Sequence, residues 1–143
     1  DIYLRALMAH CPLIEFYFGH FLRHRVLMEH ALPPPATVPV WKNEEKGSDV
    51  NLALHLLNDA WTDAYDCAVV VSNDSDLAES LRLVKQQNRK MLGLITPGAP
   101  ARKTSRQLAT HADFARTIRP SALASSQLPS PIPGANIHKP TRW

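Results

Sequence analysis

The chain has 143 residues, 45% of them hydrophobic, and carries a formal net charge of +3 at pH 7. This length suits one domain with a buried core, and no apolar run approaches the roughly 18 residues that cross a membrane. The mild excess of positive charge does not by itself indicate a nucleic-acid partner. The two cysteines, Cys11 and Cys67, show neither metal-ligand spacing nor a CxxC pattern, so we expect a reducing, cytoplasmic setting with Cys67 in the core.

The first part of the chain gives several local signals. Residues 1–10 place apolar side chains at helical spacing, and we expect a helix that ends at the first proline. The aromatic run at 13–18 (LIEFYF) is typical of a strand, and residues 21–26 either extend it or form a basic edge. The prolines between 31 and 39 predict a stiff, exposed loop, after which residues 41–47 return to the core.

Residues 48–63 form the strongest predicted helix. Ser48 follows a glycine and is a natural N-cap. Asp49 falls in the first turn, where the helix dipole favours negative charge. The apolar residues recur at helical spacing and predict a stripe that faces the core, formed by Val50, Ala53, Leu54, Leu57 and Ala60 and widened by Leu56 and Trp61.

A strand and a helix follow one another at the centre of the chain. The β-branched run at 67–72 predicts a buried parallel strand. The next helix, at 75–88, begins at Asp74 or Ser75, and either residue suits its N-cap. Four further elements are expected, namely a buried strand at 91–95, a turn at 96–100, a short helix at 105–111 and a final strand at 114–118. The alternation of strands and helices predicts an α/β domain with a mostly parallel sheet.

Composition divides the chain into two regions. The predicted domain occupies residues 1–119. Residues 120–143 are rich in serine and proline and predict an irregular C-terminal tail. Whether apolar residues of the tail pin it to the domain stays open; the candidates are Leu123, Leu128, Ile132 and Trp143.

Three aspartates fall where helices begin, Asp49 on one helix and Asp74 and Asp76 on the next. Helices that follow parallel strands begin at one edge of the sheet, where ligands bind, so we expect the three carboxylates to converge. Crowded carboxylates repel one another unless a divalent cation lies between them, and Mg²⁺ and Mn²⁺ prefer oxygen ligands. Such a cation can activate water and neutralise charge on a phosphodiester. Spacing alone leaves open that each aspartate simply caps or starts its helix.

Two ordered motifs bear on this choice. Residues 44–53 (EEKGSDVNLA) and residues 66–77 (DCAVVVSNDSDL) resemble the NYN domain, a family of the PIN-like, LabA-like nucleases. The pattern of that family runs E-K-G-x-D-V-x-L-A and then Y-D, a hydrophobic run and S-G-D-S-D-F, and Tyr65 supplies the tyrosine. The resemblance covers residues 10–119. It implies a three-layer α/β/α sandwich with a mostly parallel, Rossmann-like sheet, and metal-dependent cleavage of RNA by a bacterial protein.

The resemblance also assigns site residues. It implies that Mg²⁺ or Mn²⁺ is held by the catalytic acids Asp49, Asp74 and Asp76. Ser72 takes the hydroxyl position at the strand end, where it binds a metal-bound water or caps the turn. Trp41 either stacks on a base or packs in the core. The residues expected to contact RNA are Arg23, Arg25, Lys46, Ser72, Lys103 and Arg106.

The sequence departs from the family pattern at two places. The first strand of the family ends in an aspartate and precedes anything present here, so we expect residues missing upstream. That strand would be central in the sheet, and we expect its absence to leave an apolar groove. Asn73 stands where glycine is usual, and asparagine tolerates the left-handed backbone that such a turn needs. These departures leave open a domain that holds RNA or a protein without cutting. A third possibility is a small-molecule enzyme, because some NYN-like bacterial proteins are named as succinoylpyridine hydroxylases.

Overall fold

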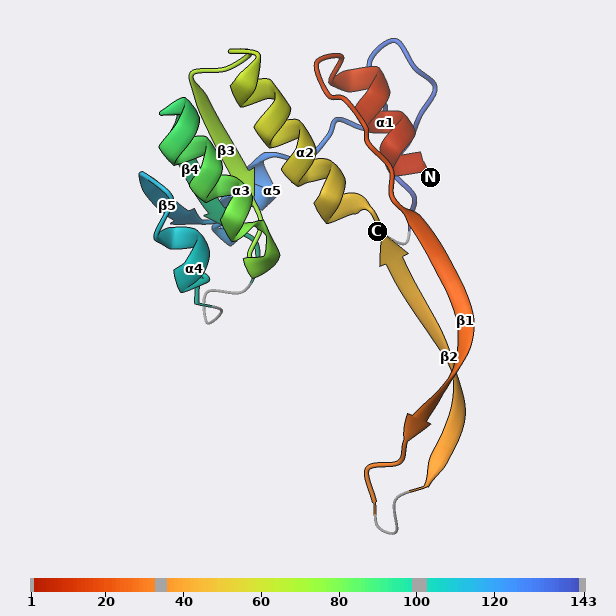
Figure 1. Ribbon diagram of the computed structural model, residues 1–143. Helices are drawn as coiled ribbons and strands as arrows, with labels where there is room; N and C mark the ends of the chain where they lie inside the picture. Colours follow the sequence, from red (N-terminus) through yellow and green to blue (C-terminus); the bar gives the residue numbers. More distant parts are fainter. Residues whose placement is uncertain (1, 33–35, 99–102, 142–143) are drawn as a thin grey trace.

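The computed structural model describes residues 2–32, 36–98 and 103–141. Figure 1 shows a sheet with its helices, a long two-stranded arm, and a unit formed by the first helix and the C-terminal segment. None of the described helices is long and apolar enough to cross a membrane. The elements in chain order are α1 (Ile2–His10), β1 (His20–Glu29), β2 (Thr37–Lys46), α2 (Ser48–Trp61), β3 (Cys67–Val71), η1 (Ser75–Leu77), α3 (Ala78–Leu83), η2 (Val84–Asn88), β4 (Met91–Thr96), α4 (Arg106–Ala109), β5 (Phe114–Thr117) and α5 (Pro120–Ser125).

Strands β3, β4 and β5 form a parallel sheet in that order. Val70 of β3 pairs with Leu94 of β4, which pairs in turn with Ala115 of β5. Short aliphatic runs bounded by turn residues suit strands of this kind. The predicted α/β fold, with a parallel sheet flanked by helices, is confirmed.

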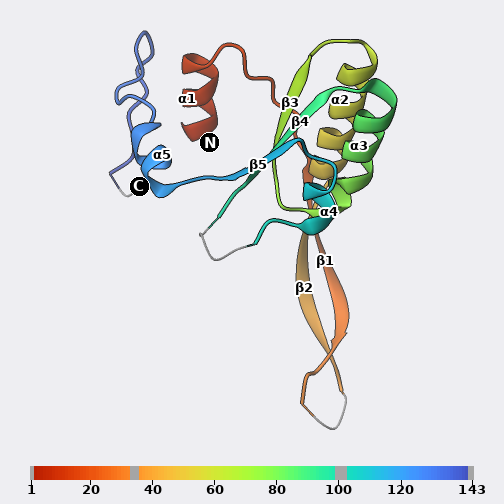
Figure 2. The same cartoon turned by 90° about the vertical axis from the view of Figure 1, so that its left-hand side faces the viewer.

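Helices cover one face of this sheet. Figure 2 shows α2 and α3 together on one side of the strands. From α2, Leu56 and Ala60 enter the core, whereas Val50, Leu54 and Trp61 of the predicted stripe are exposed. The helix therefore turns a narrower face toward the sheet than its sequence predicts. The core cluster consists of Leu56, Ala60, Val70, Leu77, Leu81, Val84, Leu92, Leu94 and Leu108.

The opposite face of β3 carries exposed apolar side chains. Val69 and Val71 are 47% and 54% exposed, and Cys67 is exposed as well. The predictions of a fully buried strand and of a core cysteine are therefore wrong. The reason is that β3 lies at the edge of the sheet and α2 and α3 cover one of its faces.

The arm is an antiparallel ribbon of β1 and β2, paired from His20 with Lys46 to Glu29 with Thr37. The predicted strand at 13–18 is wrong, since the strand begins at His20. Residues 41–47 do not return to the core, because β2 runs through residues 41–46 within the arm and Gly47 is the N-cap of α2. The expected proline loop is shorter than predicted, and its residues 33–35 lie outside the described residues, as do residues 99–100 of the expected turn. Pro39 fits β2 because both strands of an isolated ribbon are edge strands.

Two glycines lie at the base of the arm, Gly19 before β1 and Gly47 between β2 and α2. Gly47 has φ +98° and is the N-cap of α2, a left-handed conformation that glycine adopts without strain. A methyl group on Gly19 would lie 2.6 Å from the carbonyl oxygen of Lys46 and would also collide with the carboxylate of Glu45. Ser48 is not the N-cap expected from the sequence. Its hydroxyl donates instead to Glu45 Oε1 at 2.7 Å, which ties the start of α2 to the base of the arm.

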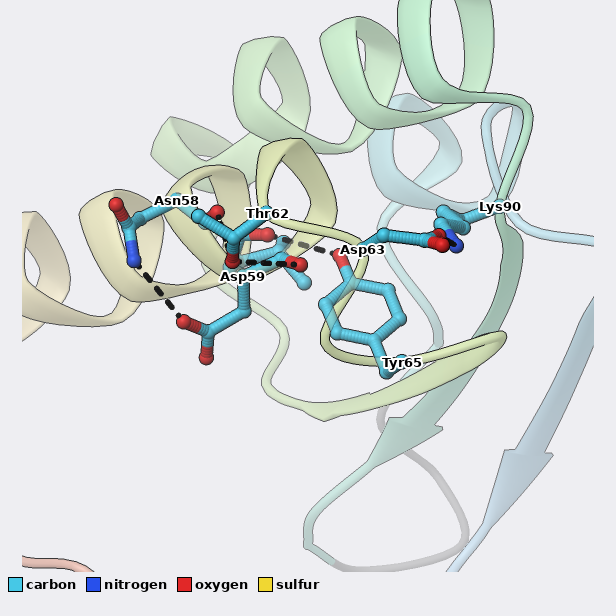
Figure 3. A network of polar contacts seen from close by, with 7 residues as sticks. Asn58, Asp59, Thr62, Asp63, Tyr65 and Lys90 are labelled. Atoms are coloured by element: carbon cyan, nitrogen blue, oxygen red, sulfur yellow. Dashed lines mark hydrogen bonds and ion pairs between the residues drawn. The ribbon is translucent and has the colours of Figure 1, made fainter.

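The predicted helix at 75–88 is a continuous run of three helical types, η1, α3 and η2. The short helix predicted at 105–111 is present but shorter, since α4 spans only Arg106–Ala109. Between α2 and β3, Tyr65 turns back toward the helix (Figure 3) and its hydroxyl donates to the carbonyl oxygen of Leu56 at 2.8 Å. In the same region Lys90 pairs with Asp63, which has a left-handed φ of 59°.

The C-terminal segment is more ordered than predicted. Its first residues form α5, and residues 127–129, 132 and 137–140 line a cavity together with residues of α1. Ile132 is 3% exposed and Ala6 of α1 is 7% exposed. Ile132 therefore pins the tail to α1, whereas Leu123 is exposed and Trp143 lies outside the described residues.

Candidate functional site

The turn after β3 is built by the polar residues that follow the strand. The backbone N–H of Asp76 donates to Asp74 Oδ1 at 3.0 Å, so Asp74 is the N-cap of η1, as one reading of the sequence predicts. The backbone N–H of Asp74 donates in turn to Ser72 Oγ at 3.1 Å. Ser72 was expected either to bind a metal-bound water or to cap the turn, and this hydrogen bond is a cap of the turn.

Asn73 links this turn to the segment after β4. Its Oδ1 accepts from the backbone N–H of Ser105 at 2.7 Å, and its Nδ2 donates to the carbonyl oxygen of Lys103 at 3.3 Å. Its backbone is not left-handed, so the conformational reason expected for asparagine here is wrong. The amide holds two loops together, a role that sequence reasoning missed because its partners lie some thirty positions away along the chain.

Asp49 lies in the first turn of α2 and faces this turn. One hollow is lined by Asp49 together with Ser72 and Asp74. A neighbouring hollow is lined by Asp49 together with Asp76 and Glu45. The start of α2 and the end of β3 therefore meet at one edge of the sheet, and Asp49 belongs to both hollows. We call the two together the acidic edge.

The carboxylates of the acidic edge differ in the hydrogen bonds that they accept. One oxygen of Asp74 is used in the cap. No described residue forms a hydrogen bond or ion pair with the side chain of Asp49 or Asp76. Within the described part of the chain, no three acidic, histidine or cysteine side chains are arranged to hold a metal ion. The donors are nevertheless of the oxygen type that Mg²⁺ and Mn²⁺ bind, so the acidic edge fits such a cation by its chemistry.

The basic residues expected to contact RNA fall in two places. Lys103 and Arg106 border the segment that Asn73 holds, next to the acidic edge. Arg23 and Arg25 lie on β1, out along the arm. Lys46 is at the base of the arm, where its Nζ lies 3.0 Å from Glu44 Oε2.

Glu44 is the most perturbed acid near the site. Hydrogen bonds from Lys42 and Lys46 lower its pKa to about 2. The carboxylate therefore stays ionised, and it offsets part of the positive charge of the two lysines. Lys46 is less free to contact a phosphate than its position in the sequence indicates.

Fold and site together define a class of protein. It is an α/β domain whose acidic side chains gather where a parallel strand ends and a neighbouring helix begins, as ligand sites of open parallel sheets do. Residues 9–118 match the NYN domain. The chain belongs to the NYN domain family.

Two known proteins are similar to this chain. The chain is 38% identical over 109 residues to 6-hydroxy-3-succinoylpyridine 3-monooxygenase HspA of Pseudomonas putida, a match that covers 74% of this chain and 35% of that protein. The chain thus spans about a third of the length of this relative. A crystal structure of a protein of unknown function from Vibrio parahaemolyticus is similar with a TM-score of 0.45 and 24% identity, covering 52% of this chain and 43% of that one.

Proposed function

We propose that this NYN domain is a metal-dependent ribonuclease of a bacterial cytoplasm, with Mg²⁺ or Mn²⁺ held by the three aspartates of the acidic edge. One observation carries the proposal. Asp49 lines the hollow that contains Asp74 and also the hollow that contains Asp76. Membership of the NYN family supports it, since the family resembles nucleases.

Each residue of the edge has a role in this proposal. Asp49 and Asp76 offer carboxylates that no described side chain or backbone group engages, and Asp74 keeps one oxygen outside its cap. A cation bound there would lower the pKa of water and neutralise charge that builds up on the phosphodiester. Ser72 and Asn73 fix the turn that carries Asp74. Lys103 and Arg106, beside this turn, would hold the RNA backbone by charge.

The test separates metal binding from helix capping. Asparagine caps a helix about as well as aspartate, so Asp74→Asn keeps the turn and removes the charge. We expect this variant to lose at least about 100-fold in Mn²⁺-dependent cleavage of single-stranded RNA, with an unchanged melting temperature. Asp59→Asn, on the same helix as Asp49 but at its other end, is the control and should cleave normally. Unchanged cleavage by Asp74→Asn would remove Asp74 from the mechanism and contradict the proposed site of three aspartates.

A second candidate is a domain that holds RNA or a protein without cutting. It is favoured by the capping role of Asp74 and by the lack of a preformed metal cluster in the described residues. Retained RNA affinity in EDTA, together with no cleavage under Mg²⁺ or Mn²⁺, would support it.

A third candidate follows from the name of the relative, which is a monooxygenase acting on a hydroxylated succinoylpyridine. The chain spans about a third of that protein. Substrate-dependent oxidation of NADH, measured by loss of its absorbance, would favour this candidate over both others.

A further inference from the structure

The arm has two faces of different chemistry. Cross-strand partners of an antiparallel ribbon lie on the same face and successive residues alternate between faces. Arg25 pairs with Trp41 and Arg23 with Asn43, so these four share one face, which we call the arginine face. Phe21 and Leu27 extend it in the two directions. Lys42, Glu44 and Lys46 lie on the other face, which we call the lysine face.

The side chains of the arginine face are open to solvent. Trp41 is 62% exposed and Phe21 is 82% exposed. The guanidinium of Arg23 lies over the indole of Trp41, with 4.9 Å from its central carbon to the ring centre. Among the residues that the structure describes, no carboxylate pairs with Arg23 or Arg25. The acids of this face lie at its ends: Glu29 at the tip, and Glu45 at the base, where it accepts from Ser48.

On the lysine face, the positive charge of the lysines is partly neutralised by a carboxylate of the same face. Both lysines form ion pairs with Glu44, and these hydrogen bonds lower the pKa of Glu44 to about 2. The two faces therefore differ in available charge, although each carries two arginine or lysine side chains. An anionic ligand that follows the arm is expected on the arginine face.

We propose that the arginine face of the arm binds single-stranded RNA, with bases stacked on Trp41 and phosphates held by Arg23 and Arg25. Exposed aromatic rings beside cationic groups are the combination that binds single strands without reading their sequence. When a guanidinium group lies over an indole ring, the N–H donors at the edge of the guanidinium point away from the ring and are available to a phosphate. The inference rests on the proposed function, because that function makes RNA the substrate. It assigns to the arm the part of the RNA that lies away from the cleavage site.

The arm also sets a distance. Trp41 is five residues from Lys46 along β2, which is about 17 Å at the rise of a strand. The base of the arm is tied to α2 by the hydroxyl of Ser48, the first residue of α2, which donates to Glu45 Oε1 at 2.7 Å, and Asp49 is the next residue of the helix. RNA seated on Trp41 thus reaches the acidic edge only if it continues for about five stacked nucleotides.

The experiment measures binding without cleavage. Fluorescence anisotropy of a labelled 12-nucleotide RNA of mixed sequence is recorded in EDTA at several salt concentrations. Arg25→Gln and Lys42→Gln each remove one positive charge. The two residues lie at neighbouring positions of the ribbon but on opposite faces, so Lys42→Gln is the matched control. We expect Arg25→Gln to weaken binding about tenfold and to lower the salt slope by about 0.7, the value for one phosphate of a single strand. Lys42→Gln should change both less.

Aromatic stacking is tested at Trp41. We expect Trp41→Ala to weaken binding by about 5- to 150-fold, the range for loss of one stacked base, and Trp41→Phe to restore most of it. Equal effects of Arg25→Gln and Lys42→Gln, or no RNA binding by the unaltered chain in EDTA, would overturn the proposal. So would a Trp41→Ala variant that binds RNA normally but, in sedimentation, converts a dimer to a monomer, because the face would then join two copies.

The same variants keep the two proposals apart. If the arm variants lose RNA affinity while no metal supports cleavage by the unaltered chain, the arm binds RNA and the nuclease proposal fails. If the unaltered chain cleaves and the arm variants bind and cleave a long RNA as well as it does, the nuclease proposal holds and the arm inference fails. A cleavage defect on 12-nucleotide RNA, absent on 4-nucleotide RNA, would agree with the distance that the arm sets.

Discussion

At the scale of single residues, Tyr65 gives the clearest dependence on pH. Burial raises the pKa of its hydroxyl to about 12, where it donates to Leu56. Its pKa in the unfolded chain is about 10, so its contribution to stability is complete below pH 10 and is lost as the pH rises through 12. Urea unfolding between pH 9 and 12 should show a steeper loss of unfolding free energy in the unaltered chain than in Tyr65→Phe. At pH 7 the variant should lose about 0.5–1.5 kcal/mol. Parallel curves would show that Tyr65 does not titrate with unfolding.

Residue roles were predictable where they depend on neighbours in the sequence. Asp74 stands two positions before the N–H that it caps, and the sequence predicts that role. Ser48 looks like a cap but is not, because Gly47 takes the position and Glu45 offers an acceptor from the arm. The bridge of Asn73 to Ser105 needs two strands placed side by side, so no local pattern reveals it. Assignment of the three aspartates to a metal stays a prediction.

At the scale of elements, the packing at the base of the arm depends on the absence of a side chain at position 19. Gly19→Ala places a methyl group 2.6 Å from the backbone oxygen of Lys46, so the arm base must move, at a cost of about 1–3 kcal/mol. Urea unfolding followed by circular dichroism measures the loss. Glu45→Ala removes the carboxylate that also crowds the site, but it loses the hydrogen bonds from Ser48 as well. The cost of Gly19→Ala is therefore measured in the unaltered chain and again in the Glu45→Ala background, where we expect it to be smaller because only the backbone oxygen still conflicts. No cost in the second background would mean that Glu45 alone creates the conflict.

Elements with internal patterns were predicted better than those that depend on a partner. The spacing of α2 and the β-branched run of β3 give their positions to within a few residues. The aromatic run at 13–18 has strand propensity, yet the strand starts at His20, because pairing with β2 decides where a ribbon forms. Exposure was not predictable in the same way. Cys67 and Val71 are exposed because of their place at the sheet edge, which a strand pattern does not contain.

At the scale of the whole molecule, the chain exposes far more surface than a compact monomer. Its accessible area is 10,899 Å², against about 7,400 Å² for a compact protein of 16.0 kDa. The arm and the separation of α1 and the tail from the sheet account for the open shape (Figures 1 and 2). Alternation of strands and helices predicts the sheet domain. It does not predict that α1 leaves the sheet and packs on Ile132, since both segments are apolar enough to pack elsewhere.

This division predicts two units that open independently. Ile132 is buried against α1, and Leu94 is buried at the centre of the sheet domain. We expect Ile132→Ala to speed amide hydrogen exchange in α1 and residues 130–138 and to leave β4 protected. Leu94→Ala should do the reverse, at about 2–5 kcal/mol of unfolding free energy for the sheet domain. Units that share few buried contacts exchange separately, whereas a single cooperative core opens as one. Faster exchange throughout the chain in both variants would therefore show that α1 and the tail belong to the same folding unit as the sheet.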